Sequence, residues 1–344
     1  MFPEELEQLM VELGEPRFRG RQLFHWLHVR GELDPSRMTD LPVGLRAHLP
    51  APSSQEIRRL RSADGLTCKL LLRLNDGQDI EVVEMLSAPS PGAARGRGGS
   101  WRKTICVSTQ AGCAMGCVFC VTGQFGFARN LEAGEIVEQV LRFAGVTNVV
   151  FMGMGEPLAN YAETVRALRL LTHPDGRRLG ARRITLSTSG LAPQIRQLAG
   201  EGVQVGLAVS LHAPNDELRT RLMPVNRRWP IAEVLAAADE YATRTGRRVS
   251  YEYTLMAGVN DSDAVADELA DLLSGRVCHV NLIPLNPSED PTLRAPSMAR
   301  ALAFESRLRA AGIAATIRQN RGRDILAACG QLRLTEKRRA AVPA

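Results

Sequence analysis

The sequence predicts an α/β fold: a partial (β/α)6 barrel with a small N-terminal helical domain and a short β-hairpin linker. From Lys103 onward, short apolar segments typical of buried strands alternate with segments of helical periodicity, which is the pattern of parallel strands covered by helices. Six or seven such units can be drawn, fewer than the eight that close a full barrel. We expect the core domain over residues 102–325 and a C-terminal tail over 326–344.

Two shorter regions precede the core. Residues 1–50 carry apolar side chains at helical spacing and predict an accessory helical domain. Residues 51–101 form a β-hairpin segment, in which ADG and NDG turn signals separate strand-like runs at 56–62, 66–74 and 80–86. The region ends in a Gly/Arg-rich stretch, 87–101, that predicts a loop.

Strands and helices alternate through the core. The predicted strands are residues 104–109, 148–155, 183–190, 205–212, 249–256, 279–286 and 315–320. The predicted helices include Leu131–Phe143, Thr164–Leu171, Ile231–Thr243, Ala264–Leu273 and Met298–Ala311. Each of these helices follows a strand, as expected where parallel strands are joined by crossover connections.

Polar residues that could carry chemistry gather where these strands end. They are Gly155 and Glu156 after the second strand, Ser187 and Ser189 at the third, Ser210 and His212 at the fourth, and Asn286 at the sixth. The carboxyl ends of parallel strands meet at one edge, where active sites of such folds are built. The sequence therefore predicts one site at this edge.

Three cysteines lie within eight residues, directly after the first predicted strand: Cys113, Cys117 and Cys120. Their C-x3-C-x2-C spacing brings three thiolates to one point without a local fourth. An iron–sulfur cluster held by three thiolates keeps one iron free for substrate chemistry, whereas a structural zinc site takes four ligands. A zinc site with Cys106 as fourth ligand, or plain core cysteines, are the alternative interpretations.

Composition limits the class of protein. The 344 residues are 44% hydrophobic and 23% charged, as in globular proteins, and show neither a membrane-spanning run nor a signal peptide. Seven cysteines, three of them crowded, favour metal ligation in a reducing compartment, so we expect a cytoplasmic protein. The net charge of +6, with clustered arginines, indicates either a phosphate-binding surface or simply solvated faces.

The run TICVSTQAGCAMGCVFCVTGQFGFARNL resembles the cluster loop of radical S-adenosylmethionine (SAM) enzymes. Further motifs follow in order: GMGEPLAN, ITLSTSG, LAVSLHAPND, RLMPVN, GVNDS, VNLIPLNP and RGRDILAACGQL. Together they resemble the RlmN/Cfr family of RNA adenine methyltransferases over roughly residues 1–335. The resemblance implies a radical-SAM barrel, a SAM-dependent RNA methyltransferase, and a [4Fe–4S] cluster on Cys113, Cys117 and Cys120.

The resemblance also implies the catalytic residues. Cys329 would take a methyl group from one SAM, and a second SAM, cleaved at the reduced cluster, would yield the radical that activates that methyl group. Two SAM are then used per turnover. Cys106 would release the adduct through a transient disulfide, and Glu84 would accept the proton of the reacting carbon. The implied SAM contacts are Gly155, Glu156, Ser187, Ser210, Leu211, His212 and Asn286.

The favoured reaction is C2-methylation of an adenosine in 23S rRNA, with tRNA as a further candidate, by an RlmN-like dual-specificity enzyme. An electron donor such as flavodoxin is the other implied partner, and we expect a monomer without membrane association. Three alternatives remain at this stage. They are C8-methylation as in the Cfr branch, a radical SAM enzyme acting on a small molecule or peptide, and a non-catalytic RNA-binding iron–sulfur or zinc protein.

Overall fold

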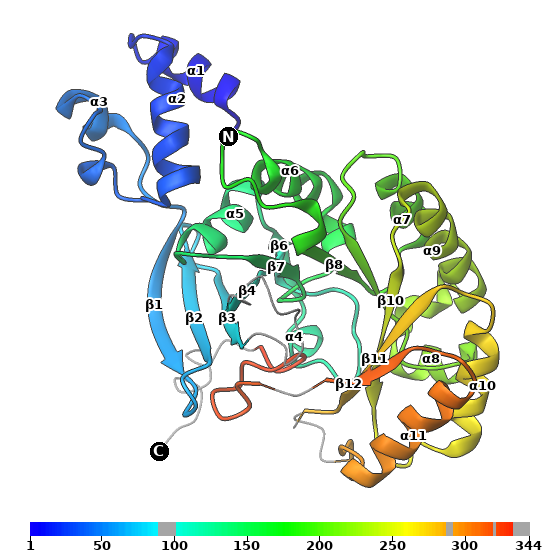
Figure 1. Ribbon diagram of the computed structural model, residues 1–344. Coiled ribbons are helices and arrows are strands. Elements are labelled where there is room, and N and C mark those ends of the chain that lie inside the picture. The colour runs from blue at the N-terminus through cyan, green and yellow to red at the C-terminus, as the bar shows by residue number, and fades with distance from the viewer. Residues whose placement is uncertain (89–100, 287–291, 319–320, 333–344) are drawn as a thin grey trace, which may run out of the picture.

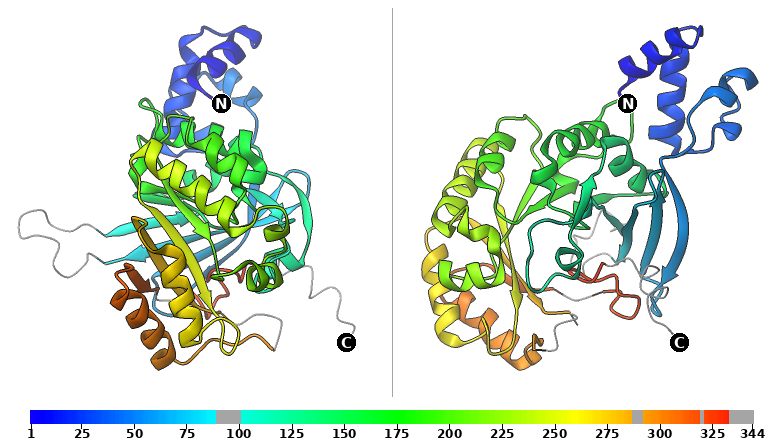
Figure 2. Two further views of the ribbon diagram at one scale, coloured as in Figure 1. Left: turned by 90° about the vertical axis from the view of Figure 1, so that its right-hand side faces the viewer. Right: turned by 180° about the vertical axis from the view of Figure 1, so that it is seen from behind.

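The computed structural model describes residues 1–88, 101–286, 292–318 and 321–332. Most of the predicted 87–101 loop, the end of the last predicted strand and the tail beyond Leu332 lie outside the described residues. The main sheet has ten strands in the order β1-β2-β3-β4-β7-β8-β9-β10-β11-β12. Figures 1 and 2 show a curved sheet with helices on its outer side and the C-terminal segment, drawn in red, at its inner side.

Seven strands of this sheet run parallel, which confirms the predicted α/β fold. They are β4 (Arg102–Cys106), β7 (Asn148–Phe151), β8 (Ile184–Thr188), β9 (Gly206–Ser210), β10 (Val249–Leu255), β11 (Cys278–Pro284) and β12 (Ala315–Ile317). The helices between them are α5 (Ala133–Leu141), α6 (Tyr161–Thr172), α7 (Ala192–Leu198), α8 (Asp216–Leu222), α9 (Ile231–Thr245), α10 (Asp263–Leu273) and α11 (Met298–Ala310). Polar residues fix the starts of several helices: Asn215, Ser262 and Ser297 each accept a first-turn N–H of α8, α10 and α11.

The three strand-like runs predicted over residues 56–86 are strands, but they do not form a separate linker. Strands β1 (Ser54–Arg61), β2 (Thr67–Leu74) and β3 (Asp79–Ser87) form an antiparallel meander. Because β3 also pairs antiparallel with β4, the meander extends the main sheet rather than linking two separate parts. This extension forms one wall of the inner side, seen at the left of Figure 1.

The N-terminal region is helical, as predicted. Helices α1 (Pro3–Glu12), α2 (Phe18–His25) and α3 (Val43–His48) project beyond the sheet in Figure 1. Gly20 lets α1 and α2 approach closely, because a Cβ there would lie 2.4 Å from the backbone nitrogen of Glu7. A second small sheet, β5 (Gln110–Gly112) with β6 (Phe127–Asn130), and the short helix α4 (Val121–Gln124) frame the cysteine-rich loop; the sequence did not predict them.

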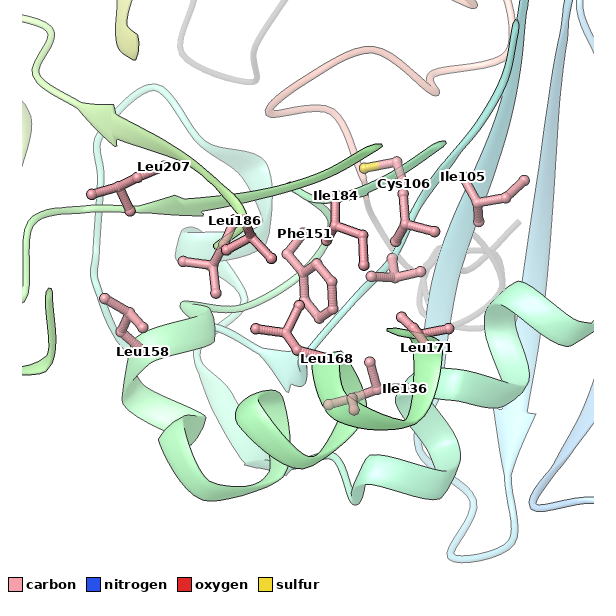
Figure 3. Close-up of a cluster of buried hydrophobic side chains, with 14 of the residues drawn as sticks. Ile105, Cys106, Ile136, Phe151, Leu158, Leu168, Leu171, Ile184, Leu186 and Leu207 are labelled. Carbon is pink, nitrogen blue, oxygen red and sulfur yellow. The ribbon is translucent and has the colours of Figure 1, made fainter. Parts of the chain in front are cut away.

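The two faces of the parallel sheet have different roles. Figure 3 shows the outer face, where Phe151 and Ile184 from the strands pack against Ile136 and Leu168 from the helices. In the same view the Cys106 sulfur points away from Phe151. Successive strand residues alternate between faces, so the inner face carries a different set of side chains, and these form the candidate site.

Candidate active site

Two adjoining cavities lie at the inner side of the sheet. The first is at the carboxyl ends of the parallel strands, and the second extends along their inner face as far as Arg102, Asn148 and Arg183, where β4, β7 and β8 begin. The first cavity is lined by residues that include Cys113, Cys117, Cys120, Gly155, Glu156, Ser187, Ser210, His212 and Asn286. The structure therefore brings together every residue predicted to bind the cluster or SAM except Leu211. The prediction that polar strand ends meet at one edge is confirmed by this lining.

The cysteine loop is shaped by its glycines and by its own hydrogen bonds. Gly112 has a φ of +81°, and a Cβ there would lie 2.1 Å from the carbonyl oxygen of Gly126. Only glycine lets the chain turn this tightly before Cys113. The N–H of Cys120 donates to the carbonyl of Cys117 at 3.1 Å, which turns the second and third thiols toward the same cavity.

The three thiols form a donor set that fits an iron–sulfur cluster. Burial raises the pKa of Cys113 to about 12 and raises the pKa values of Cys117 and Cys120 as well, so thiolates here need a cationic partner. No three His, Cys, Asp or Glu side chains in the described part of the chain are arranged to hold a metal ion as they stand. A cluster binds each thiolate on a separate iron, and so needs thiols around one cavity rather than around one atom.

Glu156 is held by hydrogen bonds at the floor of the first cavity. Its carboxylate accepts the N–H of Ser189 at 2.7 Å and the N–H of Leu158 at 3.0 Å. Burial raises the pKa of Glu156, while these hydrogen bonds act in the opposite direction. The preceding Gly155, at a φ of +97°, is required by packing, since a Cβ would lie 2.5 Å from the Cβ of Gln110.

Asn286 joins the first cavity to the C-terminal segment. Its Nδ2 donates to the carbonyl of Cys329 at 3.0 Å, whereas its Oδ1 is buried without a hydrogen-bond partner among the described residues. An unpaired buried oxygen is costly, and a ligand N–H or O–H would satisfy it. SAM offers both an amine and ribose hydroxyls, so the residues at this end of the cavity fit SAM.

His212 and Leu211 have different positions despite being neighbours. The Nδ1 of His212 accepts the N–H of Thr254 at 2.9 Å, which leaves its proton on Nε2. Burial lowers the pKa of His212 to about 3, so the ring is neutral at physiological pH. Leu211 packs in the core instead, and its N–H donates to the carbonyl of Glu252.

The second cavity contains both catalytic thiols predicted from the sequence. Cys106 and Cys329 line it together with four arginines, Arg102, Arg183, Arg318 and Arg321. Burial, and to a smaller extent charge on Cys329, raises the pKa of Cys106 to about 12. Because Cys329 lines the first cavity as well as the second, it lies in the wall between them.

Arg318 and Glu252 share that wall, and sequence reasoning did not identify them. The Nη1 of Arg318 lies 3.2 Å from Oε2 of Glu252, whose Oε1 accepts from Asn281 at 2.8 Å. Arg318 lines both cavities, and its charge acts to lower the pKa values of Cys106 and Cys329, which burial raises. Glu252 lies in β10 and Arg318 directly follows β12. These positions in or just after predicted strands were the only sequence signal that could have identified them as site residues.

The structure does not bring Glu84 into either cavity. In the β3–β4 pair, Val83 is opposite Cys106 and Glu84 is opposite Ile105. Paired residues share a face of the sheet and successive residues alternate. Since Val83 and Cys106 line the second cavity, Glu84 points to the other face, where its Oε1 pairs with Lys103 Nζ at 2.9 Å.

A different carboxylate of β3, Glu81, lies on the same face of the strand as Val83, two residues away, although it is not among the lining residues of either cavity. It is fully buried and pairs with Lys69 Nζ at 3.0 Å. The same Nζ donates to the carbonyl of Leu326, also at 3.0 Å. The Lys69–Glu81 pair therefore ties the sheet extension to the segment that carries Cys329.

Comparisons with known proteins agree with this geometry. Residues 107–272 match the radical SAM superfamily, and residues 1–53 match the ribosomal RNA large subunit methyltransferase N-terminal domain. The chain is 47% identical to a probable dual-specificity RNA methyltransferase RlmN of Symbiobacterium thermophilum, over 98% of this chain and 91% of that protein. It is 48% identical to the ribosomal RNA large subunit methyltransferase N of Nitrosopumilus maritimus, over 97% of each.

A solved structure gives the same result for the fold. The crystal structure of a radical SAM methyltransferase from Sphaerobacter thermophilus superposes with a TM-score of 0.91 at 52% identity, covering 97% of this chain and 98% of that chain. Within the described residues, no helix is both long enough and apolar enough to cross a bilayer.

Proposed function

The chain belongs to the RlmN family of radical SAM methyltransferases, and from this premise we propose that it methylates C2 of an adenine base in 23S rRNA and in tRNA. The names of its relatives support an RNA substrate. The observation that carries the proposal is the position of Cys329, which faces both a cavity suited to SAM and a cavity rich in arginine. A thiol that carries a methyl group from SAM to the adenine base has to reach both the SAM cavity and the cavity that receives the RNA.

We propose that Cys113, Cys117 and Cys120 hold the [4Fe–4S] cluster. When bound, the cluster would supply the electron that splits SAM to a 5′-deoxyadenosyl radical. Gly155, Glu156, Ser187, Ser210, His212 and Asn286 would hold SAM, with the backbone of Leu211 fixed behind them. The Oδ1 of Asn286 and the Nε2–H of His212 are the acceptor and donor that the protein leaves available there.

The two thiols would act in sequence. Cys329 would accept a methyl group from one SAM. The 5′-deoxyadenosyl radical from a second SAM would take a hydrogen atom from that methyl group, and the resulting methylene carbon would bond to the adenine carbon. The adduct radical would then give up one electron to the oxidised cluster. Cys106 would then attack the Cys329 sulfur, so that a disulfide forms as the carbon–sulfur bond breaks. An external electron donor would reduce the disulfide before the next turnover. The lining of one cavity by both thiols supports this order of steps.

Release of the product also requires removal of a proton from the methylated carbon. We propose Glu81 for this role in place of Glu84, because Glu81 lies on the face of β3 that carries Val83 and faces Cys106. The arginines of the second cavity would contact the RNA phosphates. The division into residues 1–50, 51–101, 102–325 and 326–344, a monomeric state and a flavodoxin-like donor remain predictions.

The proposal is tested by mass spectrometry of nucleosides from 23S rRNA and tRNA, in cells with and without the gene. Loss of 2-methyladenosine from both RNAs is the expected result. Loss of 8-methyladenosine instead would move the reaction to the other carbon. No change in either nucleoside would reject RNA adenine as the substrate.

A further inference from the structure

Arg219 is the largest fully buried side chain of the described residues, and it lies behind the first cavity. Its guanidinium donates to the carbonyls of Ser189 at 2.7 Å, Ser210 at 3.0 Å and Leu211 at 3.1 Å. It also donates to Oδ1 of Asn226 at 2.8 Å and, more weakly, to the carbonyl of Trp229. These acceptors satisfy its donors, but every one of them is electrically neutral.

The positive charge of Arg219 is therefore not balanced by a carboxylate in contact with it among the described residues. The exposed Asp216 acts on this charge electrostatically but makes no hydrogen bond to the guanidinium; it is linked to it through Asn226, whose Nδ2 donates to Oδ1 of Asp216 at 2.9 Å. A buried charge without a paired opposite charge is expensive to maintain. Burial accordingly lowers the pKa of Arg219 to about 10, which leaves it protonated at neutral pH.

The anion that would balance this charge belongs in the first cavity. Helix α8, which carries Arg219, packs against the cysteine loop, where the N–H of Val118 donates to the carbonyl of Leu222 at 3.1 Å. Ser189 and Ser210, whose carbonyls bind the guanidinium, both line the cavity. The charge of Arg219 also acts on the thiol of Cys117 and on His212.

We propose that Arg219 is a positioning residue whose fixed positive charge offsets the negative charge of the iron–sulfur cluster and its three thiolates. This inference rests on the proposed cluster site. An oxidised four-iron cluster with three thiolates carries net negative charge, and reduction adds one more electron. A nearby fixed cation favours the reduced state, because net charge around a cluster sets its potential. Arg219 thus raises the reduction potential and, through its three carbonyl contacts, holds the ends of β8 and β9 in place.

The test compares three variants by redox titration of the reconstituted cluster, followed by electron paramagnetic resonance. Arg219→Gln removes the charge, and Arg219→Lys keeps it. The double variant Asp216→Asn/Asn226→Asp keeps the guanidinium and the total charge, but moves a carboxylate from the exposed position into contact with Nη1. Arg177→Gln, which removes a half-buried arginine that lines neither cavity, is the control.

We expect Arg219→Gln and the double variant each to lower the ratio of reduced to oxidised cluster at fixed potential at least tenfold, which is a fall of about 59 mV for a one-electron couple. Arg219→Lys should retain most of the native potential and Arg177→Gln all of it. A native potential in the double variant, or an equal fall in Arg219→Lys and Arg219→Gln, would overturn the inference. If Arg219→Gln fails to fold, the potential of the double variant tests the inference. If the double variant fails to fold, the comparison of Arg219→Lys with Arg219→Gln tests it.

Iron and sulfide analysis of the unaltered protein keeps this inference separate from the proposed function. If the unaltered protein binds no four-iron cluster, both the proposed cofactor and the inference are wrong. If it binds the cluster and the potentials do not depend on Arg219, only the inference is wrong.

Discussion

Substitution of the two glutamates of β3, Glu81 and Glu84, distinguishes their functions. Glu81→Gln keeps the shape of a buried side chain on the face that carries Val83 but removes its ability to accept a proton. Glu84→Gln makes the same chemical change on the opposite face. We expect Glu81→Gln to slow product release from the RNA adduct by about 10²- to 10⁴-fold, the usual contribution of a general base. Glu84→Gln should leave the rate of methylation within about twofold of native.

Stability must be separated from catalysis, because Glu81 is paired with the buried Lys69. Removing one partner of a buried ion pair costs about 3–5 kcal/mol, and Gln retains one acceptor oxygen, so we expect a cost of about 3 kcal/mol or less. The double variant Lys69→Met/Glu81→Gln removes the unpaired ammonium as well. It should recover most of that stability, apart from about 1 kcal/mol for the lost hydrogen bond to the Leu326 carbonyl, and should remain as slow as Glu81→Gln.

The assay is single-turnover methylation of an RNA substrate, sampled for covalent adduct and for free methylated RNA, with urea unfolding of the same preparations. Accumulation of adduct in Glu81→Gln and in the double variant, with ordinary turnover in Glu84→Gln, is the expected pattern. Normal release by Glu81→Gln together with adduct accumulation in Glu84→Gln would refute the assignment from strand register.

Three further predictions follow from the same structure. Cys106→Ala should methylate Cys329 and couple it to RNA but not release the product, so that denaturing gels show RNA bound to protein; free methylated RNA at the native rate would contradict the disulfide step. Gly155→Ala should lower the free energy of unfolding by about 2 kcal/mol or more, because of its φ of +97° and the 2.5 Å approach to Gln110. Its control, Gly258→Ala, meets no atom within 4 Å at a φ of +71° and should cost about 1 kcal/mol; equal costs would contradict the packing argument. Burial lowers the pKa values of His28 and His212 from 6.5 to about 3, so the unfolded state binds protons that the folded state does not. The free energy of unfolding of the apo-protein should therefore be highest above pH 6.5 and fall by about 2 kcal/mol per histidine by pH 5; a pH-independent unfolding curve would exclude neutral buried rings.

The sequence was sufficient for the parallel strands and for the first cavity, because both follow from local patterns. Strand ends at Glu156, Ser187, Ser210 and Asn286 could be read from alternating apolar runs, and parallel topology then places them at one edge. The three cysteines were recognisable from spacing alone. These features need no knowledge of how distant segments pair.

Features that depend on which residues of neighbouring strands pair could not be predicted from local sequence patterns. Glu81 and Glu84 both lie in one apolar strand, and only the pairing of Val83 with Cys106 shows which of them shares a face with that thiol. The resemblance to the family led to Glu84, which lies on the opposite face from Cys106, because residues an odd number of positions apart lie on opposite faces of a strand. The burial of Arg219 could not be predicted either. An arginine in a helix is normally solvated, and nothing in the local sequence indicates that its partners are carbonyls at the ends of β8 and β9.

Placing Cys329 on a separate C-terminal segment has a consequence for the reaction. A thiol fixed in a strand faces one side only, whereas Cys329 borders both cavities and is held by bonds from three directions: Asn286 to its own carbonyl, Lys69 to Leu326, and the N–H of Val121 to Gly330 at 2.9 Å. Asn286 lines the first cavity, and Val121 directly follows Cys120, which lines it too. Lys69 is the ion-pair partner of Glu81. Loading of the first cavity and protonation of Glu81 would therefore both act on the backbone around Cys329. If the proposed roles hold, the residues that bind the cofactors and the residue that accepts the substrate proton would be connected through the one segment that borders both cavities.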